Sequence, residues 1–143
     1  MTALEVLHVK AGHDLLTTAF AGPGIPLYDG KLPATTTTLA MPWVLSYTSV
    51  EFEHDDPDVS LLNESSTCIT TWQLQVAAAN NTAAMAVLGV IRTALLDVVP
   101  VISGRVCGPI RMVSVQLGRN DEGIGTAVLD PIAIYELKTR PAS

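Results

Sequence analysis

The stretch TTWQLQVAAANNTAAMAVLGVI (70–91) changes its pattern at two asparagines in its middle. Before them, apolar and polar side chains alternate over 68–78, which is typical of a strand in an antiparallel sheet that is covered on one face. After them, no polar residue occurs from 83 to 91. Asparagine side chains are good helix N-caps, so we expect a helix over 83–99 that ends at the following proline.

The expected helix over 83–99 lacks a polar stripe along its first half, and this constrains the fold more than any other feature. A helix that is apolar all round is buried on all sides, which is hard to achieve in a domain of 143 residues without a partner. We therefore expect an oligomer, with Ala83, Ala86 and Val90 at the subunit interface. The alternative is that the segment 22–42 folds back and covers the helix within one subunit.

The other periodic segments predict one further helix and three further strands. Leucines recur at helical spacing over 3–20, and a Gly-Pro-Gly turn ends that helix. Pro131, inside the last expected strand, predicts an edge position or a bulge. With the strand over 68–78, the alternating segments predict strands over 43–53, 105–118 and 127–139.

These elements follow the order α-β-β-α-β-β and predict an α+β fold, an antiparallel four-stranded sheet with two helices packed on one face. No internal repeat or linker appears, so one domain covers 1–143. The proline-rich segment 22–42 is expected to be irregular, and an acidic loop is expected over 53–67.

Acidic side chains are concentrated in one place. The net charge of −6 and the lack of clustered Lys and Arg argue against a protein that grips nucleic acid. The cluster could hold a hard divalent cation, but it lacks the glycine and distal glutamate of an EF-hand loop, so a solvated, repulsive loop is the preferred interpretation. Its members are Glu51, Glu53, Asp55, Asp56 and Asp58.

No catalytic, cofactor-binding or metal-binding constellation is recognisable in the sequence. His8 and His13 lie five positions apart, which puts them on different faces of a helix and predicts solvated or capping side chains. Cys68 and Cys107 lack CxxC spacing and predict reduced, buried thiols. The N-terminus lacks a secretory signal, and the apolar run is too short to cross a bilayer. Three arginines that flank the expected third strand could form subunit salt bridges: Arg105, Arg111 and Arg119.

Six short sequence phrases are spread along nearly the whole chain. They are IPLYDGKLP (25–33), MPWVLSY (41–47), WQLQV (72–76) before an Ala-rich helix, SGRVCGPI (103–110), the pair Arg119 and Asp121, and Tyr135-Glu136-Leu137. In their order and spacing they resemble the tail terminator (tail completion) proteins of long-tailed bacteriophages, particularly those that infect actinobacteria. The chain departs from that pattern at 51–58, where the family has a shorter Gly-containing turn. It also has AAAN (77–80) where the family often has a glycine before the helix.

The resemblance implies a non-enzymatic structural protein of the virion, at the head-proximal end of the tail and assembled in the host cytoplasm. Six copies would form a ring that caps the tail tube, stops its polymerisation and offers a surface for head–tail joining. Its partners would be further copies of itself, the major tail tube protein and the head-completion or connector protein, with no membrane and no cofactor. DNA would only pass through the lumen, where an acidic loop at the lumen or at an axial face would repel it.

Two other classes of function remain open. One is another head–tail joining component, such as a head-completion (stopper) protein or a minor capsid protein. The other is a small α+β ligand-binding or enzymatic domain, which requires a pocket lined by convergent polar groups. The sequence offers no such cluster.

Overall fold

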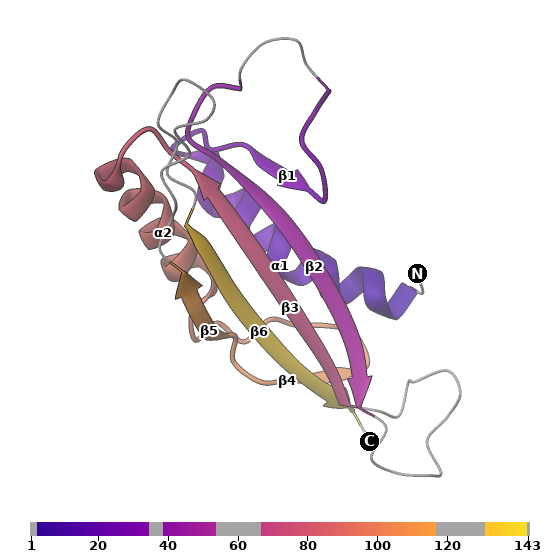
Figure 1. Ribbon diagram of the computed structural model, residues 1–143. Coiled ribbons are helices and arrows are strands. Elements are labelled where there is room, and N and C mark those ends of the chain that lie inside the picture. Colours follow the sequence, from indigo (N-terminus) through magenta and orange to yellow (C-terminus); the bar gives the residue numbers. More distant parts are fainter. Residues whose placement is uncertain (1–2, 35–38, 54–66, 117–130, 143) are drawn as a thin grey trace.

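The protein folds into two layers, a sheet and a pair of helices that lie on one of its faces (Figure 1). The computed structural model describes residues 3–34, 39–53, 67–116 and 131–142. The predicted α+β class with two helices is confirmed. In chain order the elements are α1 (Ala3–Ala21), β1 (Leu27–Asp29), β2 (Trp43–Glu53), β3 (Thr67–Ala77), α2 (Asn81–Leu95), β4 (Arg105–Cys107), β5 (Arg111–Gln116) and β6 (Ile132–Pro141).

The sheet is six-stranded and mixed, and it differs in this from the predicted four-stranded antiparallel sheet. Its order is β1-β2-β3-β6-β4, with β5 also paired to β6. Only β1 and β2 run parallel. The sequence predicts an irregular segment over 22–42, whereas β1 lies within it. A three-residue strand among prolines leaves no periodicity to read, so only its pairing with β2 reveals it.

The predicted third strand is divided into β4 and β5. Pro109 lies at the division and has no N–H to donate to a ladder. Before it, the N–H of Gly108 donates to the carbonyl of Lys138 (3.0 Å). After it, the N–H of Ile110 donates instead to the carbonyl of Val98 (2.8 Å). The two short strands therefore pair with different stretches of the same edge of β6.

β6 is a central strand, with β3 on one side and β4 and β5 on the other, so the edge position predicted from Pro131 is wrong. Pro131 comes just before the first strand residue, Ile132, where its missing N–H interrupts no ladder. Its carbonyl accepts a hydrogen bond from the N–H of Val76 (2.9 Å). A register shift does occur, but it lies in the neighbouring β5, between Met112 and Ser114.

Local signals set the beginning of α2 and the end of α1. The Gly-Pro-Gly turn ends α1 as predicted: Gly24 has a φ of 70°, and the N–H of Ile25 donates to the carbonyl of Phe20 (3.1 Å). The N-cap of α2 is Asn80, whose side chain accepts from the N–H of Ala83 (2.8 Å). The predicted asparagine N-cap is therefore confirmed for Asn80, and Asn81 is the first residue of the helix.

The end of α2 lies earlier than predicted, at Leu95 instead of residue 99. Asp97 adopts the left-handed conformation that often follows a helix (φ 63°). Its N–H donates to the carbonyl of Ile110 (2.9 Å). The segment 97–98 is thus held by Ile110, so the chain leaves the helix before the expected proline stop.

The core lies between the sheet and the helices. Residues between the core positions, such as Gln73 and Lys138, are exposed on the other face, so coverage of the strand over 68–78 on one side is confirmed. The largest buried side chains of the two central strands alternate along them: Trp72, Leu74, Val76, Tyr135 and Leu137. They belong to one cluster with the inner sides of the helices, formed by Leu16, Phe20, Val87, Ile91 and Leu95.

α1 packs tightly against the sheet at Trp72. Gly12 faces its indole ring, and a Cβ at this position would lie 2.3 Å from Trp72 Cε2. The indole N–H donates to the carbonyl of Val9, one turn earlier in the helix (3.3 Å). Close packing, and not an unusual backbone conformation, therefore requires a glycine at position 12.

Candidate interaction surfaces

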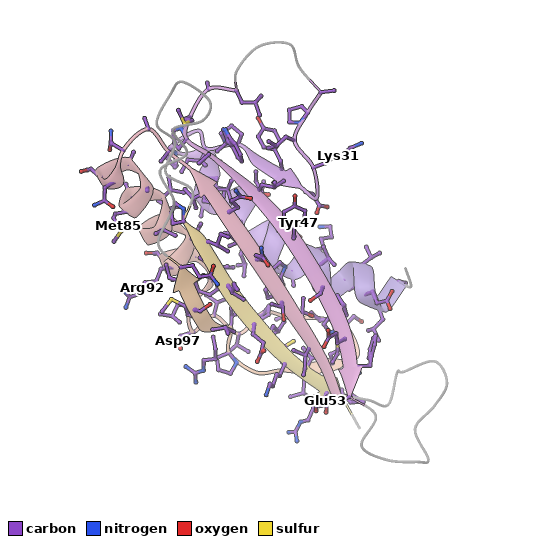
Figure 2. All side chains as sticks on the ribbon, viewed as in Figure 1. Lys31, Tyr47, Glu53, Met85, Arg92 and Asp97 are labelled. Carbon is purple, nitrogen blue, oxygen red and sulfur yellow. The ribbon has the colours of Figure 1, made fainter. Side chains whose placement is uncertain are left out.

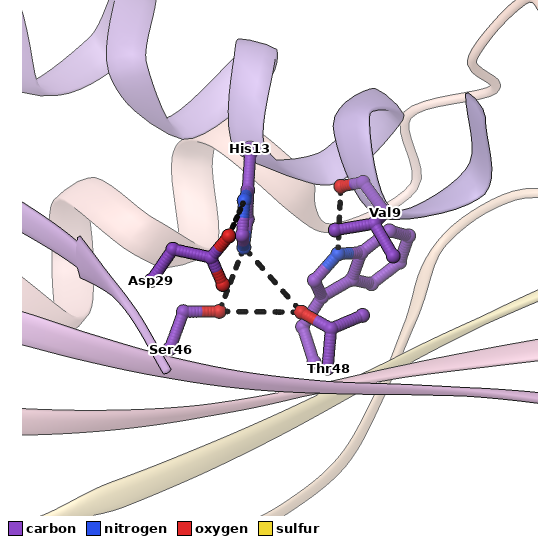
Figure 3. Close-up of polar contacts among 6 residues, drawn as sticks. Val9, His13, Asp29, Ser46 and Thr48 are labelled. Atoms are coloured by element: carbon purple, nitrogen blue, oxygen red, sulfur yellow. Dashed lines mark hydrogen bonds and ion pairs between the residues drawn. The ribbon is translucent and has the colours of Figure 1, made fainter. Parts of the chain in front are cut away.

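The inner side of α1 is tied to the sheet by a histidine. Nε2 of His13 forms a hydrogen bond with Oγ of Ser46 (2.8 Å), and its Nδ1 lies 4.0 Å from Oδ2 of Asp29 (Figure 3). Burial lowers the pKa of His13, and the carboxylates of Asp29 and Asp14 oppose this effect. The solvated or capping side chain predicted for His13 is wrong, because the ring links α1 to β1 and β2.

This cluster has the chemical order of a Ser-His-Asp triad, but its serine is inaccessible. A nucleophile has to reach the substrate, and Ser46 is 0% exposed beneath α1. Its hydroxyl also lies 3.4 Å from that of Thr48. We interpret the cluster as a structural link between layers. Sequence reasoning had no signal for it, because only the fold brings these residues together.

A second histidine anchors the N-terminal half of α1. Nδ1 of His8 lies 2.7 Å from the carbonyl oxygen of Leu4, and its Nε2 lies 2.8 Å from Oγ1 of Thr139. The same Oγ1 accepts a hydrogen bond from Nε of Arg105 (3.1 Å). A neutral ring with its hydrogen on Nδ1 satisfies all three bonds, in agreement with the lowering of the His8 pKa by burial. His8 is fully buried, so the prediction of a solvated or capping side chain is wrong here too.

Arg105, one of the three arginines considered for subunit salt bridges, is an internal residue. It is 9% exposed, and Nη2 donates to the carbonyl of Thr139 (3.1 Å), in addition to the bond to the hydroxyl. Burial lowers its pKa. Because its hydrogen bonds are made within the chain, we exclude Arg105 from the subunit interface proposed below.

The two cysteines flank Thr139 on opposite sides. Cys68 of β3 and Cys107 of β4 are both register partners of Thr139 in β6. Two strand spacings separate them, about 9–10 Å, which exceeds the reach of a disulfide. Both are free, and burial raises the pKa of each thiol. The prediction of reduced, buried thiols is confirmed for Cys68, whereas the free thiol of Cys107 is only half-buried.

The outer side of α2 and the adjoining β5 form an open, largely apolar surface. Figure 2 shows Met85 and Arg92 pointing away from the body of the protein. Met85 is 56% exposed and Val113 is 55% exposed. A groove of about 230 Å³ lies between the helix and the strand, lined by Met85, Leu88, Gly89, Arg92, Met112, Val115 and Tyr135. We name the following residues the α2–β5 surface: Met85, Ala86, Gly89, Met112, Val113 and Val115.

The predicted interface residues on α2 lie partly on this surface. Ala86 is exposed, whereas Ala83 and Val90 are half-buried. A Cβ at Gly89 would have no atom of the described residues within 4 Å, so the described part of 22–42 does not cover this side. Among the described residues, α2 is buried through Ala84, Val87, Ile91 and Leu95, and its opposite side has no cover.

A second apolar surface lies at the opposite edge of the sheet, where β2 passes over α1. β1 pairs only with Val44–Ser46, so β2 extends beyond its neighbour from Tyr47 onward. Val6 is 47% exposed and Tyr47 is 48% exposed. A groove of about 500 Å³ follows this edge, lined by Val6, Val9, Lys10, His13, Asp29, Gly30, Tyr47 and Thr48. We name Val6, Val9 and Thr48 the α1–β2 surface; Tyr47, the register partner of Gln73, lines the same edge but points to the sheet face without helices.

The charged candidates divide between described and undescribed parts of the chain. Glu51 and Glu53 are exposed near the end of β2, on the sheet face without helices. Arg111 forms an exposed ion pair with Asp97 (2.5 Å), which is worth little by itself. The remaining candidates lie outside the described residues: Asp55, Asp56, Asp58 and Arg119.

Two further classes of site receive no support from the part of the chain that the structure describes. Among these residues, no group of three or more His, Cys, Asp or Glu could hold a metal ion. None of the helices described here is long and apolar enough to span a membrane.

Comparison with known proteins gives a match in structure alone. No family model matches the sequence, and no curated protein matches it. The fold is similar to that of a chain in the virion of a native gene transfer agent (GTA) particle, with a TM-score of 0.72 and 15% sequence identity. The similarity covers 98% of this chain and 99% of the other. The two chains therefore share one fold over nearly their whole length.

Proposed function

We propose that this chain is a structural protein of a phage-like virion, of the tail terminator type. The observation that carries the proposal is the fold shared with a virion chain over 98% of this sequence. The order of sequence phrases from 25–33 to 135–137 points to the same class independently of the fold. In this role the chain caps the tail tube, stops its polymerisation and joins the tail to the head.

Two different apolar surfaces on one chain support assembly into a ring. The α2–β5 surface and the α1–β2 surface lie at opposite edges of the sheet (Figure 2). A contact between unlike surfaces is heterologous, and repetition of such a contact closes a ring or extends a filament. The ring of six copies follows from the resemblance to tail terminators. Its further partners would be the major tail tube protein and the head-completion or connector protein.

The acidic residues fit passage of DNA through the ring without specific binding. By their register in the β2–β3 ladder, the exposed Glu51 and Glu53 lie on the sheet face that the helices leave open. With Asp55, Asp56 and Asp58 they would bring five carboxylates per copy to the lumen or to an axial face. Such a ring repels a polyanion, so that DNA slides instead of adhering.

The test is an assay of tube length with the purified chain and the major tail tube protein of the same particle. Addition of the chain to growing tubes should give short tubes with a ring at one end, as seen by electron microscopy. Tubes of unchanged length without rings would reject the terminator role.

Gold-labelled antibody against the chain, applied to intact particles, separates the alternatives. Label at the head–tail joint is expected. Label on the capsid shell favours a minor capsid protein, and label on tailless heads favours a head-completion protein.

A further inference from the structure

We propose that neighbouring copies join through both layers of the fold at once. The edge of β5 in one copy pairs with the free edge of β2 in the next, and α2 of the first copy packs beside the N-terminal half of α1 of the second. This inference rests on the proposed function, because it specifies the contact that would close the ring.

The backbone of both edges is available for pairing. β1 covers only Val44–Ser46, which leaves the seven residues from Tyr47 to Glu53 without a neighbour among the described strands. β5, six residues long, pairs with β6 on one side, and no described strand lies on its other side. Unpaired strand edges are templates for pairing with another chain. The two free edges are also matched in length.

The directions of the strands fit an antiparallel junction. β2 is antiparallel to β3, β3 to β6 and β6 to β5, so β5 runs opposite to β2. If the next copy lies beside β2 in the same orientation, the two copies place β5 antiparallel to β2. The alternation of strand directions then continues across the junction. Through the ladders Ser114 aligns with Tyr47, whereas the free edge is centred on Val50. Because opposed residues share a face, the next copy is shifted by two or four residues along the strands, the kind of stagger that closed sheets require.

The side chains of β5 suit the groove beside β2. Met112 and Val115 oppose the buried Tyr135 and Ala133, so they point to the sheet face that carries the helices. Both are nearly half exposed. In the continued sheet they face the groove of about 500 Å³ that Val6, Val9 and Thr48 line on that same face. The junction would bury apolar side chains on both sides.

The same displacement brings the helix layers together. α1 and α2 already pack side by side within one copy, with α2 on the side of β6 and α1 extending beyond β2 (Figure 1). The next copy's α2 would therefore approach α1 from its free side, near Val6. Ala86 and Gly89 are small, and the position of a Cβ at Gly89 is open, which permits close approach of the two helices.

The charges on the open face of the sheet agree with this arrangement. Arg111 opposes Glu136 in the β5–β6 ladder and so lies on the face that also carries Glu51 and Glu53. Pairing of β5 with β2 brings this arginine toward the acidic end of the neighbouring strand. The β5 edge and the complementary β2 edge belong to the same chain. We therefore expect each edge to bind a second copy of this chain.

Pairs of introduced cysteines test the strand contact. Ser114, Ser49 and Glu51 all point to the open face, and same-face neighbours across an antiparallel junction are within disulfide reach. The variants are S49C/S114C and E51C/S114C, which sample two registers. The control is S114C/K138C, because Lys138 is on the same face but on a strand paired on both sides. Unmodified chain, with its own Cys68 and Cys107, is oxidised in parallel.

The expected result is a ladder of covalent oligomers that ends at the ring size for at least one edge pair, and no ladder for the control or the unmodified chain. Native mass spectrometry of the same samples separates the two proposals. A ring without any ladder overturns the edge contact and leaves the proposed function standing. A ladder that continues without an end supports the contact and overturns the closed ring. A chain that stays monomeric up to its solubility limit, alone and with tube ends, overturns both.

Discussion

Each helix of this protein carries a glycine, and the two glycines have opposite surroundings. At Gly12 of α1 a Cβ would lie 2.3 Å from the ring of Trp72, whereas at Gly89 of α2 it would meet nothing within 4 Å. Glycine costs a helix about 1 kcal/mol relative to alanine at either position. Packing within the chain accounts for the first glycine and not for the second. α1 is therefore fitted to its own sheet, whereas the described residues leave the outer side of α2 uncovered.

Gly12→Ala should give the largest effect on the isolated chain. Its methyl group overlaps a fully buried indole, and overpacking of a core costs about 1–3 kcal/mol. After subtraction of the gain in helix propensity, about 1 kcal/mol, we expect a net loss of up to about 2 kcal/mol in the free energy of unfolding, measured by urea denaturation. Gly22→Ala is the matched control, because its Cβ position is open and its φ is not positive. Equal stability of the two variants would show that Trp72 has room to move.

Ala86→Arg should act on assembly and leave the fold of one copy intact. The side chain is exposed on the outer side of α2, so surface substitution changes the stability of the isolated chain by less than about 0.5 kcal/mol. A bulky charge in the proposed contact should raise the dissociation constant at least about tenfold, which corresponds to 1.4 kcal/mol. Native mass spectrometry over a concentration series measures this. Gln73→Arg, on the other face of the sheet, is the control. Identical assembly of both variants would remove α2 from the interface.

A decrease in pH should destabilise the packing of α1 on the sheet and leave the packing of α2 unchanged. Burial lowers the pKa of both His8 and His13. The charge of Arg105 lowers the pKa of His8 further. The unfolded chain therefore binds more protons than the folded chain below about pH 6.5. Stability from these rings is complete above that pH and falls as the pH decreases, by at most about 1.4 kcal/mol per pH unit for each histidine.

Urea denaturation across this pH range measures the slope, and His8→Gln and His13→Gln should each reduce it. Hydrogen-exchange protection should decrease in α1 before it decreases in α2. A slope that is unchanged in both variants would contradict the neutral, buried state of the two rings.

The parts of the fold that the sequence predicts are those with a periodic or capping signal. The alternation over 68–78, the cap at Asn80 and the one-sided coverage of the sheet are written in local pattern. β1 and the early end of α2 could not be predicted from the local sequence pattern. Both depend on backbone hydrogen bonds to distant segments, such as that from Asp97 to Ile110. Tertiary pairing decides these elements, and local propensity does not report it.

The candidate surfaces were predictable to a similar degree. The apolar run that contains Ala86 indicates a helix that has to be covered on several sides, and the described residues cover it on one side only. The β2 edge beside Val6 has no signal in the sequence, since it becomes free only because β1 is short. Arg105 shows the converse, because an arginine in a surface-like pattern is held inside by Thr139. Whether a polar side chain faces inward depends on partners from other strands.

Gly89→Ala is the smallest and most selective test of the comparison between the two glycines. The added methyl group meets open space in one copy and improves helix propensity, so the isolated chain should gain about 0.5–1 kcal/mol in its free energy of unfolding. The same methyl group should weaken association if another copy packs closely against α2, because it holds the two backbones apart. Urea denaturation of the monomer and native mass spectrometry of the oligomer give the two values. A stabler monomer with weaker assembly places the glycine in a contact between copies. A gain in both would mean that the neighbour meets α2 elsewhere, most directly at Met85.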